Sequence, residues 1–330
     1  MVSVRDVAAD ARVSVGTVSN VLNRPERVAP ETVEKVHASI ARLGFVRNDA
    51  ARQLRAGRSK SIGLVVLDIR NPFFAEVARG AEERAAEHGY SVLVANSDEK
   101  HQRESTHLDL FEEQRVAGVL ITPVEEALPR LERMREHGIP SVLVDRESHD
   151  SRFCSVAVDD VMGGRIAAAH LLDQGRRRLA LVGGPAALRQ VSDRLRGAQD
   201  AAAERGVGVE FIGTDALSVE EGRRAGERIL ARDPADRPDA IFAANDLLAL
   251  GLLQSLVMTG DVRVPDDIAL IGYDDIDYAA AAVIPLSSVR QPAALIGSTA
   301  VDLLLGTEHP ADEHVLFEPE LVARDSTRGA

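Results

Sequence analysis

Residues 4–23 read VRDVAADARVSVGTVSNVLN and contain two short apolar patterns with a break between them. Apolar residues recur at helical spacing over 4–11, Val13 and Ser14 interrupt the pattern, and it resumes over 18–22. This spacing predicts two amphipathic helices around a tight turn, a helix-turn-helix whose second helix would enter the DNA major groove. The alternative is an ordinary helical pair that packs onto a larger domain, because the pattern alone has false positives.

The second predicted helix carries short polar side chains that suit contact with DNA. Ser14 is placed to cap this helix, and further polar groups follow it at Thr17, Ser19, Asn20 and Asn23. Asn20 is able to hydrogen-bond a base or a phosphate, whereas Val15 offers only contact with a thymine methyl group and Gly16 reaches no base edge. The base sequence that this helix would bind is therefore left open.

The composition is that of an ordinary globular protein of two or three domains. The chain has 330 residues, 45% hydrophobic and 28% charged, and no apolar run reaches the length of a membrane span. The N-terminus lacks an apolar signal region, so we expect a cytoplasmic protein without a membrane partner. The single cysteine, Cys154, excludes an internal disulfide and is expected to be a small buried strand residue rather than a metal ligand.

The net charge of -13 hides a strong asymmetry along the chain. Residues 1–60 hold eleven Lys and Arg against six Asp and Glu, whereas residues 61–330 hold 28 against 46. Neutralising DNA phosphates requires local cations rather than a positive protein as a whole. The charge therefore favours a DNA-binding N-terminus on an acidic body.

A third helix and a short polar segment complete the N-terminal region. Pro30 is able to open a helix whose apolar stripe runs to Leu43 and which Gly44 ends. Residues 48–56, NDAARQLRA, predict a helix of only two turns, which is marginal alone in water. From sequence alone this segment is either such a helix or a plain linker.

From residue 61 onward, apolar strands alternate with helices. The first set has strands near 62–67, 91–95, 118–122, 141–144 and 153–158, and the second has strands near 179–182, 211–212, 240–243 and 268–272. Continuous apolar strands separated by helices imply parallel sheets that are covered on both faces. The sequence thus predicts two successive open α/β lobes, followed by a helix near 293–305 and a strand near 315–318.

Residues that directly follow the strands are the candidates for ligand binding, because ligands of open α/β sheets sit beyond the carboxyl ends of the strands. Position alone is weak support, since loop residues are often polar without a ligand. These residues are Asp68, Asn71, Phe73, Phe74, Asn96, Thr122, Asp145, Arg146, Asp159, Gly183, Gly184, Asn245, Asp246, Tyr273, Asp274 and Asp275.

Motifs over the whole chain resemble those of the LacI/GalR family of transcriptional regulators. At the N-terminus, DVA (6–8), VS (13–14), TVS (17–19) and LN (22–23) match the family pattern. In the body the similar segments are NPFF (71–74), VDR (144–146), HLL..G..R.A..GG (170–184), S.R..G (192–197), A.ND..A.G (243–251), GYDD (272–275) and PLSSVRQP (285–292).

The resemblance implies a fold class and a division into domains. It implies an all-α helix-turn-helix head (1–47), a hinge helix and linker (48–60), and a two-lobed α/β body like periplasmic binding proteins (61–330). Lobe 1 would comprise about 61–159 plus 291–318, and lobe 2 about 160–290 plus 319–330. Several crossings would then join the lobes and act as a hinge around a cleft.

The resemblance also assigns functional residues. In relatives the hinge helices of two copies order together in the minor groove and wedge a leucine between base pairs, for which Leu54 is the match. The predicted DNA-binding set is Ser14, Val15, Gly16, Thr17, Ser19, Asn20, Asn23, Arg27, Asn48, Ala51 and Leu54. The predicted effector-binding set is Phe73, Phe74, Asp145, Arg196, Asn245, Asp274 and Gln291, with no metal or cofactor.

An arginine fork, an aspartate and an aromatic face suit a sugar or a related metabolite. The absence of Trp, and the lack of an aromatic residue near Leu217 where some relatives place one, argue against a fully stacked sugar pocket.

The leading hypothesis is a repressor that binds a pseudo-palindromic operator as a homodimer and is switched by a small-molecule effector between the lobes. The alternative is a solute-binding protein of a transport or sensing system, which the predicted head disfavours. An enzyme is disfavoured because the sequence has neither a phosphate-binding glycine motif nor a recognisable set of nucleophile and base.

Overall fold

The chain forms two compact units, Met1–Ser59, called the head, and Lys60–Ala330, called the body. The computed structural model describes residues 2–45, 59–124, 128–148, 152–258, 262–306 and 313–328. The predicted hinge-helix residues Asn48, Ala51 and Leu54 lie outside these ranges.

The head contains the predicted helices and a short 3₁₀ turn: α1 (Val4–Asp10), α2 (Val15–Asn23), η1 (Pro25–Arg27) and α3 (Pro30–Leu43). Ser14 caps α2, because its hydroxyl accepts a hydrogen bond from the backbone N–H of Thr17 at 2.9 Å. Pro30 opens α3, and Gly44 ends it in the left-handed conformation at φ 62°. The helix-turn-helix prediction and the predicted capping residue are confirmed.

The core of the head is small. Its buried apolar side chains come from all three α-helices and are Val7, Ala8, Val18, Val21 and Val36. A core of this size gives the head a small free energy of unfolding, so we expect the head to tolerate few changes to these residues.

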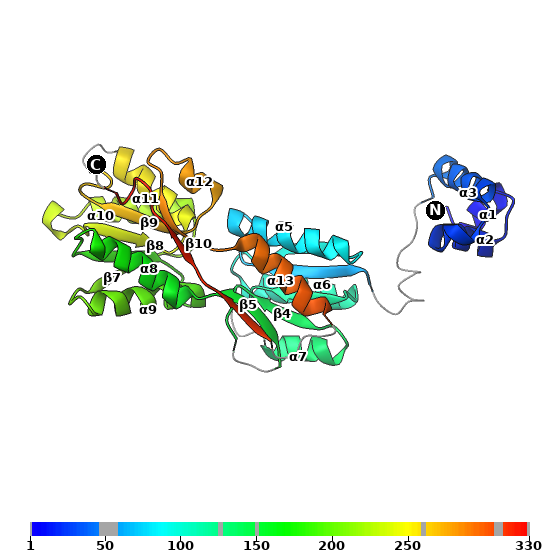
Figure 1. The fold of residues 1–330 in the computed structure, drawn as a ribbon, viewed down its shortest axis with the longest axis horizontal. Coiled ribbons are helices and arrows are strands. Elements are labelled where there is room, and N and C mark those ends of the chain that lie inside the picture. The colour runs from blue at the N-terminus through cyan, green and yellow to red at the C-terminus, as the bar shows by residue number, and fades with distance from the viewer. Residues whose placement is uncertain are drawn as a thin grey trace. The chain divides into compact units, whose positions relative to one another are not determined.

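The first lobe of the body is a six-stranded sheet in the order β11-β5-β4-β3-β1-β2, parallel throughout (Figure 1). Its strands are β1 (Ser61–Val66), β2 (Ser91–Asn96), β3 (Gly118–Ile121), β4 (Ser141–Val144), β5 (Cys154–Val158) and β11 (His314–Phe317). Its helices are α5 (Pro72–Glu87), α6 (His101–Glu113), α7 (Leu128–Glu136) and α13 (Ala293–Leu305).

Side chains of β1 pack alternately on the two faces of this sheet. Ile62 and Leu64 join the cluster that includes α5 and α13, whereas Val65 joins the cluster that includes α6 and α7. Cys154 is a buried residue of β5, as predicted.

The prediction that every strand is covered on both faces is wrong for β2. This strand lies at the edge of the sheet, and Leu93 and Val94 on its two faces are 42% and 43% exposed. An apolar sequence does not reveal whether a strand will be central or terminal, because that depends on strand order.

The second lobe is also six-stranded, in the order β12-β10-β9-β8-β6-β7, with β12 antiparallel at one edge. Its strands are β6 (Leu179–Gly183), β7 (Val209–Gly213), β8 (Ala240–Ala243), β9 (Ala269–Asp274), β10 (Ser287–Arg290) and β12 (Glu320–Val322). Its helices are α8 (Asp160–Asp173), α9 (Arg189–Ala203), α10 (Val219–Leu230), α11 (Asp246–Met258), the short α12 (Asp277–Ala280) and the 3₁₀ turn η2 (Pro234–Asp236). Sequence reasoning missed α12, β10 and β12, which are too short to show a clear period.

Three helix pairs pack closely through glycines that face the partner backbone. A Cβ atom on Gly164 of α8 would lie 2.0 Å from the carbonyl oxygen of Arg194, and one on Gly197 of α9 would lie 1.9 Å from that of Val161. The pairs α5 with α13 and α10 with α11 use Gly80, Gly297, Gly222 and Gly251 in the same way. These glycines set the positions of the helices that carry the cleft residues.

The chain passes between the lobes three times, after β5, after β10 and between β11 and β12 (Figure 1). The helix and strand predicted for residues 293–318 therefore belong to the sheet of the first lobe. None of the helices in the described ranges combines the length and apolar character of a membrane span.

Candidate functional site

The surface of α2 presents the residues that were predicted to contact DNA. Val15, Gly16 and Asn20 are exposed, while Thr17 and Ser19 are half-buried. A Cβ atom on Gly16 would come no closer than 3.6 Å to another atom, the hydroxyl oxygen of Ser14. Packing within the head therefore does not require glycine at this position.

Four members of the predicted DNA-binding set bond to one another in two pairs along α2 and its N-cap. Ser14 Oγ lies 2.8 Å from Thr17 Oγ1, and Asn23 Nδ2 donates to the carbonyl oxygen of Ser19 at 2.8 Å. These bonds stabilise α2, and contact between these residues and DNA stays a prediction.

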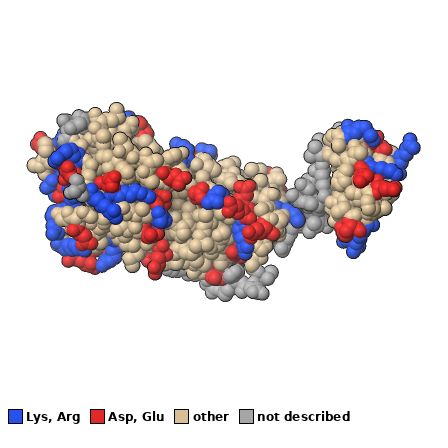
Figure 2. Space-filling view, turned by 45° about the horizontal axis from the view of Figure 1, so that its top comes forward, with Lys and Arg blue, Asp and Glu red and all other residues tan. Residues whose placement is uncertain are grey.

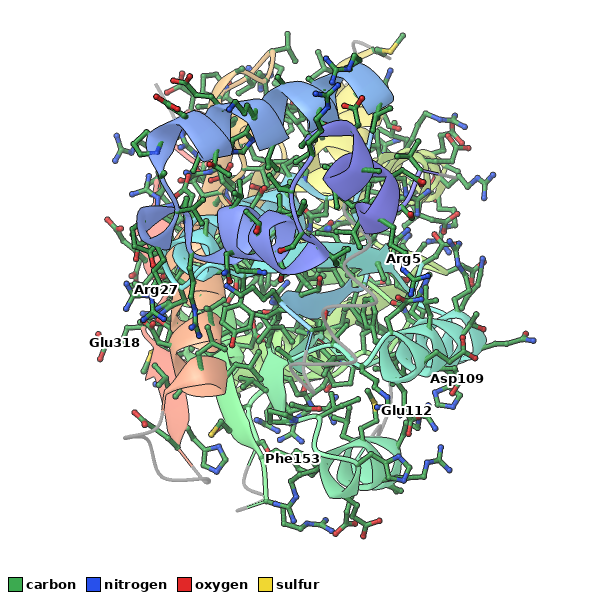
Figure 3. All side chains as sticks on the ribbon, turned by 90° about the vertical axis from the view of Figure 1, so that its right-hand side faces the viewer. Arg5, Arg27, Asp109, Glu112, Phe153 and Glu318 are labelled. Carbon is green, nitrogen blue, oxygen red and sulfur yellow. The ribbon has the colours of Figure 1, made fainter. Side chains whose placement is uncertain are left out.

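The head also carries cations that no acidic side chain neutralises. Within residues 2–45, the ion pair joins Arg42 to Asp10, and the cations without a carboxylate partner are Arg5, Arg12, Arg24, Arg27 and Lys35. Lys and Arg side chains project from several sides of the head in Figure 2, and Figure 3 shows Arg5 and Arg27 toward opposite ends of it. Exposed, unpaired cations are what binding to a phosphate backbone requires.

A cleft between the two lobes of the body gathers polar side chains from the ends of several strands. Lobe 1 and the crossing after β10 contribute Leu67, Asp68, Asn71, Phe73, Phe74, Glu99, Asp145 and Gln291. Lobe 2 contributes Gln190, Arg194, Leu217, Asn245 and Asp274. The structure thus brings together six of the seven predicted effector-binding residues, all except Arg196.

Direct hydrogen bonds join the two lobes across this cleft. Asn71 caps α5 with its carbonyl oxygen and donates through Nδ2 to Asp274 Oδ2 at 2.8 Å. From the other lobe, Gln190 Nε2 donates to Asp145 Oδ2 at 3.0 Å and to the Asp145 backbone oxygen at 2.9 Å. The free space in the cleft is about 30 Å³, which is room for little more than a water molecule.

Further bonds orient the remaining polar side chains of the cleft. Gln291 Nε2 donates to Asp274 Oδ1 at 2.7 Å, and Asn245 bonds the Leu217 carbonyl oxygen while its own oxygen caps α11 through Leu248. Asp145 Oδ1 and Gln291 Oε1 are buried without a hydrogen-bond partner among the described residues. These two acceptors are available to a ligand that enters.

An aromatic pair forms the apolar part of the cleft wall. Phe73 and Phe74 begin α5, are 4% and 5% exposed, and pack edge to face with ring centroids 5.0 Å apart. Both rings therefore belong to the lobe core and to the cleft wall at once.

The prediction for Arg196 is wrong in position. Its side chain is 57% exposed, pairs with Asp193 Oδ1 at 3.0 Å and does not line the cleft. Two residues along an α-helix correspond to about 200° of rotation, so Arg194 and Arg196 face opposite sides of α9. Arg194 is the arginine that lines the cleft, with a side chain only 4% exposed.

Burial raises the pKa values of three acids in the cleft, Asp145, Asp274 and Glu99. Burial raises the pKa of Asp145 to about 8, helped by the charge of Asp160, and burial raises the pKa of Asp274 to about 6 despite Arg194. Glu99 reaches a pKa of about 7 through burial and the nearby Asp68. The cleft wall contains four carboxyl groups and one cation, an arrangement that disfavours an anionic ligand.

Several cleft residues were outside the predicted effector set. Asp68, Asn71 and Glu99 follow strands, so the strand-end rule points to them. Arg194 is the arginine of the S.R..G motif itself, and counting the motif strictly would have found it. Gln190 had no signal beyond lying one helical turn before Arg194.

Within the described ranges, no three His, Cys, Asp or Glu side chains are grouped so that they would hold a metal ion. The cleft chemistry is that of hydrogen bonding to a small molecule. Its donors, acceptors and aromatic rings are those of a binding site for a polar ligand.

Family comparisons match both parts of the chain. Residues 3–48 match the description "Bacterial regulatory proteins, lacI family", and residues 168–327 match "Periplasmic binding protein-like domain". The ribose operon repressor of Bacillus subtilis (strain 168) is 35% identical over 331 residues, which cover 99% of each chain.

Solved structures agree with these matches over the full fold. The lac repressor dimer bound to operator and the anti-inducer ONPF superposes with a TM-score of 0.83 at 28% identity, covering 99% of each chain. A LacI family transcriptional regulator from Enterococcus faecium with bound ribose has a TM-score of 0.73 at 26% identity, covering 81% of this chain and 98% of that one.

These relatives confirm the predicted family and fold class. A solute-binding protein would not account for the N-terminal match, and the family consists of regulators rather than enzymes. The chain belongs to the LacI family of bacterial regulatory proteins, and it is a DNA-binding transcriptional regulator whose two-lobed body receives a small-molecule effector.

Proposed function

We propose that this protein is a cytoplasmic repressor that binds a pseudo-palindromic operator as a homodimer and is switched by a neutral sugar, with a pentose such as D-ribose as the first choice. The observation that carries the sugar proposal is the cleft itself. It combines carboxylate and amide acceptors, one arginine fork and an aromatic pair within a closed space between two lobes.

The charge of the cleft supports a neutral effector. Below its pKa of about 8 Asp145 is largely protonated, but the other three carboxyl groups of the cleft still outnumber its single cation. A phosphate or carboxylate group on the ligand would therefore be repelled. Hydroxyl groups donate to carboxylates, and the rings of Phe73 and Phe74 cover the apolar face of a sugar. Leu217 on the opposite side offers no second ring, which supports a small sugar covered by aromatic rings on one side only.

Competition between the effector and the interlobe hydrogen bonds supports a switch. A sugar has no room while Asn71 bonds Asp274 and Gln190 bonds Asp145, so its entry requires those bonds to open or exchange. The lobes would then change their relative geometry, and the hinge segment 48–60 would respond. The proposed domains remain 1–47 for the head, 48–60 for the hinge, and 61–330 for the body with its two lobes.

The head supports operator binding through residues of two kinds. Ser14, Val15, Gly16, Thr17, Ser19, Asn20 and Asn23 form the proposed groove-facing set on and before α2, and Arg27 with the other unpaired cations would meet phosphates. Leu54, with Asn48 and Ala51, would act in the minor groove.

The exposed edge of lobe 1 supports a homodimer. Leu93 and Val94 on β2 and Leu110 on α6 are each more than two-fifths exposed. Exposed apolar side chains at a sheet edge are typical of a protein interface. A second copy of this chain is the occupant that we propose, since a two-fold operator requires two heads.

The test is a fluorescence-anisotropy titration of the full-length protein on DNA from upstream of its own gene. We expect a salt-dependent complex with two copies per site, and we expect D-ribose, but not D-ribose 5-phosphate, to change its affinity. Leu54→Ala should weaken the complex, and operator binding as tight as wild type would refute the hinge wedge. Equal effects of the two sugars would refute the neutral-sugar proposal.

A further inference from the structure

The Arg194 guanidinium is held on three sides inside the second lobe. Nε donates to Asp160 Oδ1 at 2.8 Å, and Nη1 donates to the Ala244 carbonyl oxygen at 2.6 Å. The guanidinium carbon lies 3.6 Å from the ring centroid of Tyr273, a close cation–π contact. Burial opposes the Arg194 charge, yet the surrounding carboxylates, Asp160 foremost, still raise its pKa.

Asp160 reaches Arg194 because of how α8 is placed. It is the first residue of α8 and follows the first crossing between the lobes, which leaves β5 at Val158. The glycine contacts between α8 and α9 bring the start of α8 against Arg194. One turn further along α8, Gly163 leaves the space that the Tyr273 hydroxyl fills, since a Cβ atom there would lie 2.1 Å from it.

The third nitrogen of this guanidinium, Nη2, is available for a hydrogen bond in the cleft. Arg194 lines the cleft, and no bond of Nη2 to another side chain is found among the described residues. Asp145 Oδ1 in the same wall is also without a partner there. Opposite charges at close range attract strongly when buried, so an unrestrained Arg194 would turn toward Asp145 and occupy the place of a ligand.

We propose that Asp160 is a positioning residue for the effector: it holds Arg194 away from Asp145, so that one guanidinium nitrogen and one carboxylate oxygen both remain open to the ligand. The same bond links Arg194 to the first crossing between the lobes. Ligand contact at Arg194 is therefore transmitted directly to that interlobe crossing. This inference rests on the proposed sugar-responsive cleft.

A pH signature distinguishes this role from a purely structural one. Asp145 faces Asp160 on α8, Arg194 and Gln190 on α9, and Asp274 at the end of β9. A sugar hydroxyl donates to the ionised carboxylate, so affinity should rise as pH increases toward the Asp145 pKa of about 8. The charge of Asp160 contributes to that raised pKa, so Asp160→Asn should move the rise to lower pH.

The experiment compares Asp160→Asn and Asp160→Ala in the full-length protein by calorimetric titration with D-ribose from pH 6 to 9. The matched control is Asp173→Asn, which removes the charge from another α8 aspartate that pairs with an arginine outside the cleft, Arg205 in the turn after α9. At pH 9 we expect Asp160→Ala to weaken binding by about 10-fold or more, and Asp160→Asn by about 3-fold, because its amide oxygen still accepts from Arg194. The control should match wild type at every pH.

A measurement without ligand completes the test. The Arg194 Nε–H nuclear magnetic resonance signal, assigned by its loss in Arg194→Lys, should exchange slowly with water in wild type and in Asp173→Asn, and rapidly in Asp160→Ala. An unchanged signal in a folded Asp160→Ala protein overturns the inference, as does unchanged ribose affinity. If wild type itself does not bind D-ribose, the pentose proposal fails, while the exchange measurement still decides the role of Asp160.

Discussion

In the head, Arg5, Arg12 and Arg27 lie at the surface without a carboxylate partner among residues 2–45, whereas in the cleft the polar side chains of the two lobes bond to one another. The difference follows from what each surface has to meet. DNA phosphates are always charged. Cations that are already exposed and unpaired break no ion pair when they bind phosphates, so the main free-energy cost is the loss of their hydration. A buried cleft has to satisfy its polar groups in the absence of ligand, and it does so with its own side chains.

The affinities of the two sites are therefore limited by different free-energy terms. Operator binding depends on how many cations the head presents and on salt. Effector binding depends on how much more favourable the hydrogen bonds between ligand and cleft are than the hydrogen bonds that the cleft side chains make to one another without ligand.

The largest effect is expected for the cleft arginine, with its exposed neighbour on α9 as the control. Arg194→Lys keeps a cation beside Asp160 but loses the fork that bonds several acceptors at once. Loss of a charged hydrogen bond, about 1.5–3 kcal/mol, predicts roughly 10- to 100-fold weaker D-ribose binding by calorimetry.

Arg196→Lys provides the comparison within the same helix, because Arg196 is exposed and its ion-pair partner among the described residues is Asp193, outside the cleft lining. We expect its ribose affinity to match wild type. If Arg196→Lys weakened binding and Arg194→Lys did not, the assignment of the cleft arginine from this structure would be reversed.

The next effect concerns how the buried carboxyl group of Asp145 makes the folding stability depend on pH. The folded-state pKa of Asp145, about 8, lies above its ordinary value of 3.8, so the protonated form favours folding. The stability contributed is complete below about pH 4 and is lost as pH rises through 8. The amide of Asp145→Asn cannot ionise. Between pH 6 and 8 the free energy of unfolding in urea should therefore decrease in both proteins, but the decrease should be roughly 1–3 kcal/mol smaller in the variant than in wild type.

Glu99 and Asp274 shift in the same direction, to pKa values of about 7 and 6, so the variant should retain part of the pH dependence. The exposed Asp173→Asn serves as the control and should follow wild type. Parallel pH profiles for Asp145→Asn and wild type would show that Asp145 is already ionised in the closed cleft.

The smallest effect tests the unpaired cations of the head. Arg27→Ala should weaken operator binding by about 3- to 10-fold at physiological salt and reduce the slope of log affinity against log salt by about 1. The reason is that Arg27 has no carboxylate partner among the described head residues and is exposed.

Arg42→Ala is the paired counterpart, because Arg42 already bonds Asp10 within the head. It should leave the salt slope unchanged even if it lowers head stability slightly. A slope that changes for Arg42 and not for Arg27 would mean that pairing within the head does not decide which cations meet phosphates.

The sequence alone was sufficient for the head and for the general architecture of the body. Apolar spacing and capping chemistry act between residues a few positions apart, so Ser14, Pro30 and Gly44 marked helix ends that the structure has in the same places. Alternating apolar strands and helices likewise implied two parallel sheets, which is correct except for β12, the antiparallel edge strand of the second sheet. Most of the predicted effector-binding residues lie at strand ends because the topology of such sheets brings those ends together.

The tertiary structure alone decided which neighbouring residue faces the cleft and which strand remains exposed. Arg194 and Arg196 differ only by their rotation around α9, and that choice depends on the glycine contacts that fix α9 against α8. Gln190 reaches Asp145 only because the lobes close on each other, and β2 is exposed only because it ends the strand order. The S.R..G motif points to Arg194 only by resemblance to a family. The physical cause of each of these properties is contact between distant segments, which apolar spacing and capping residues do not specify.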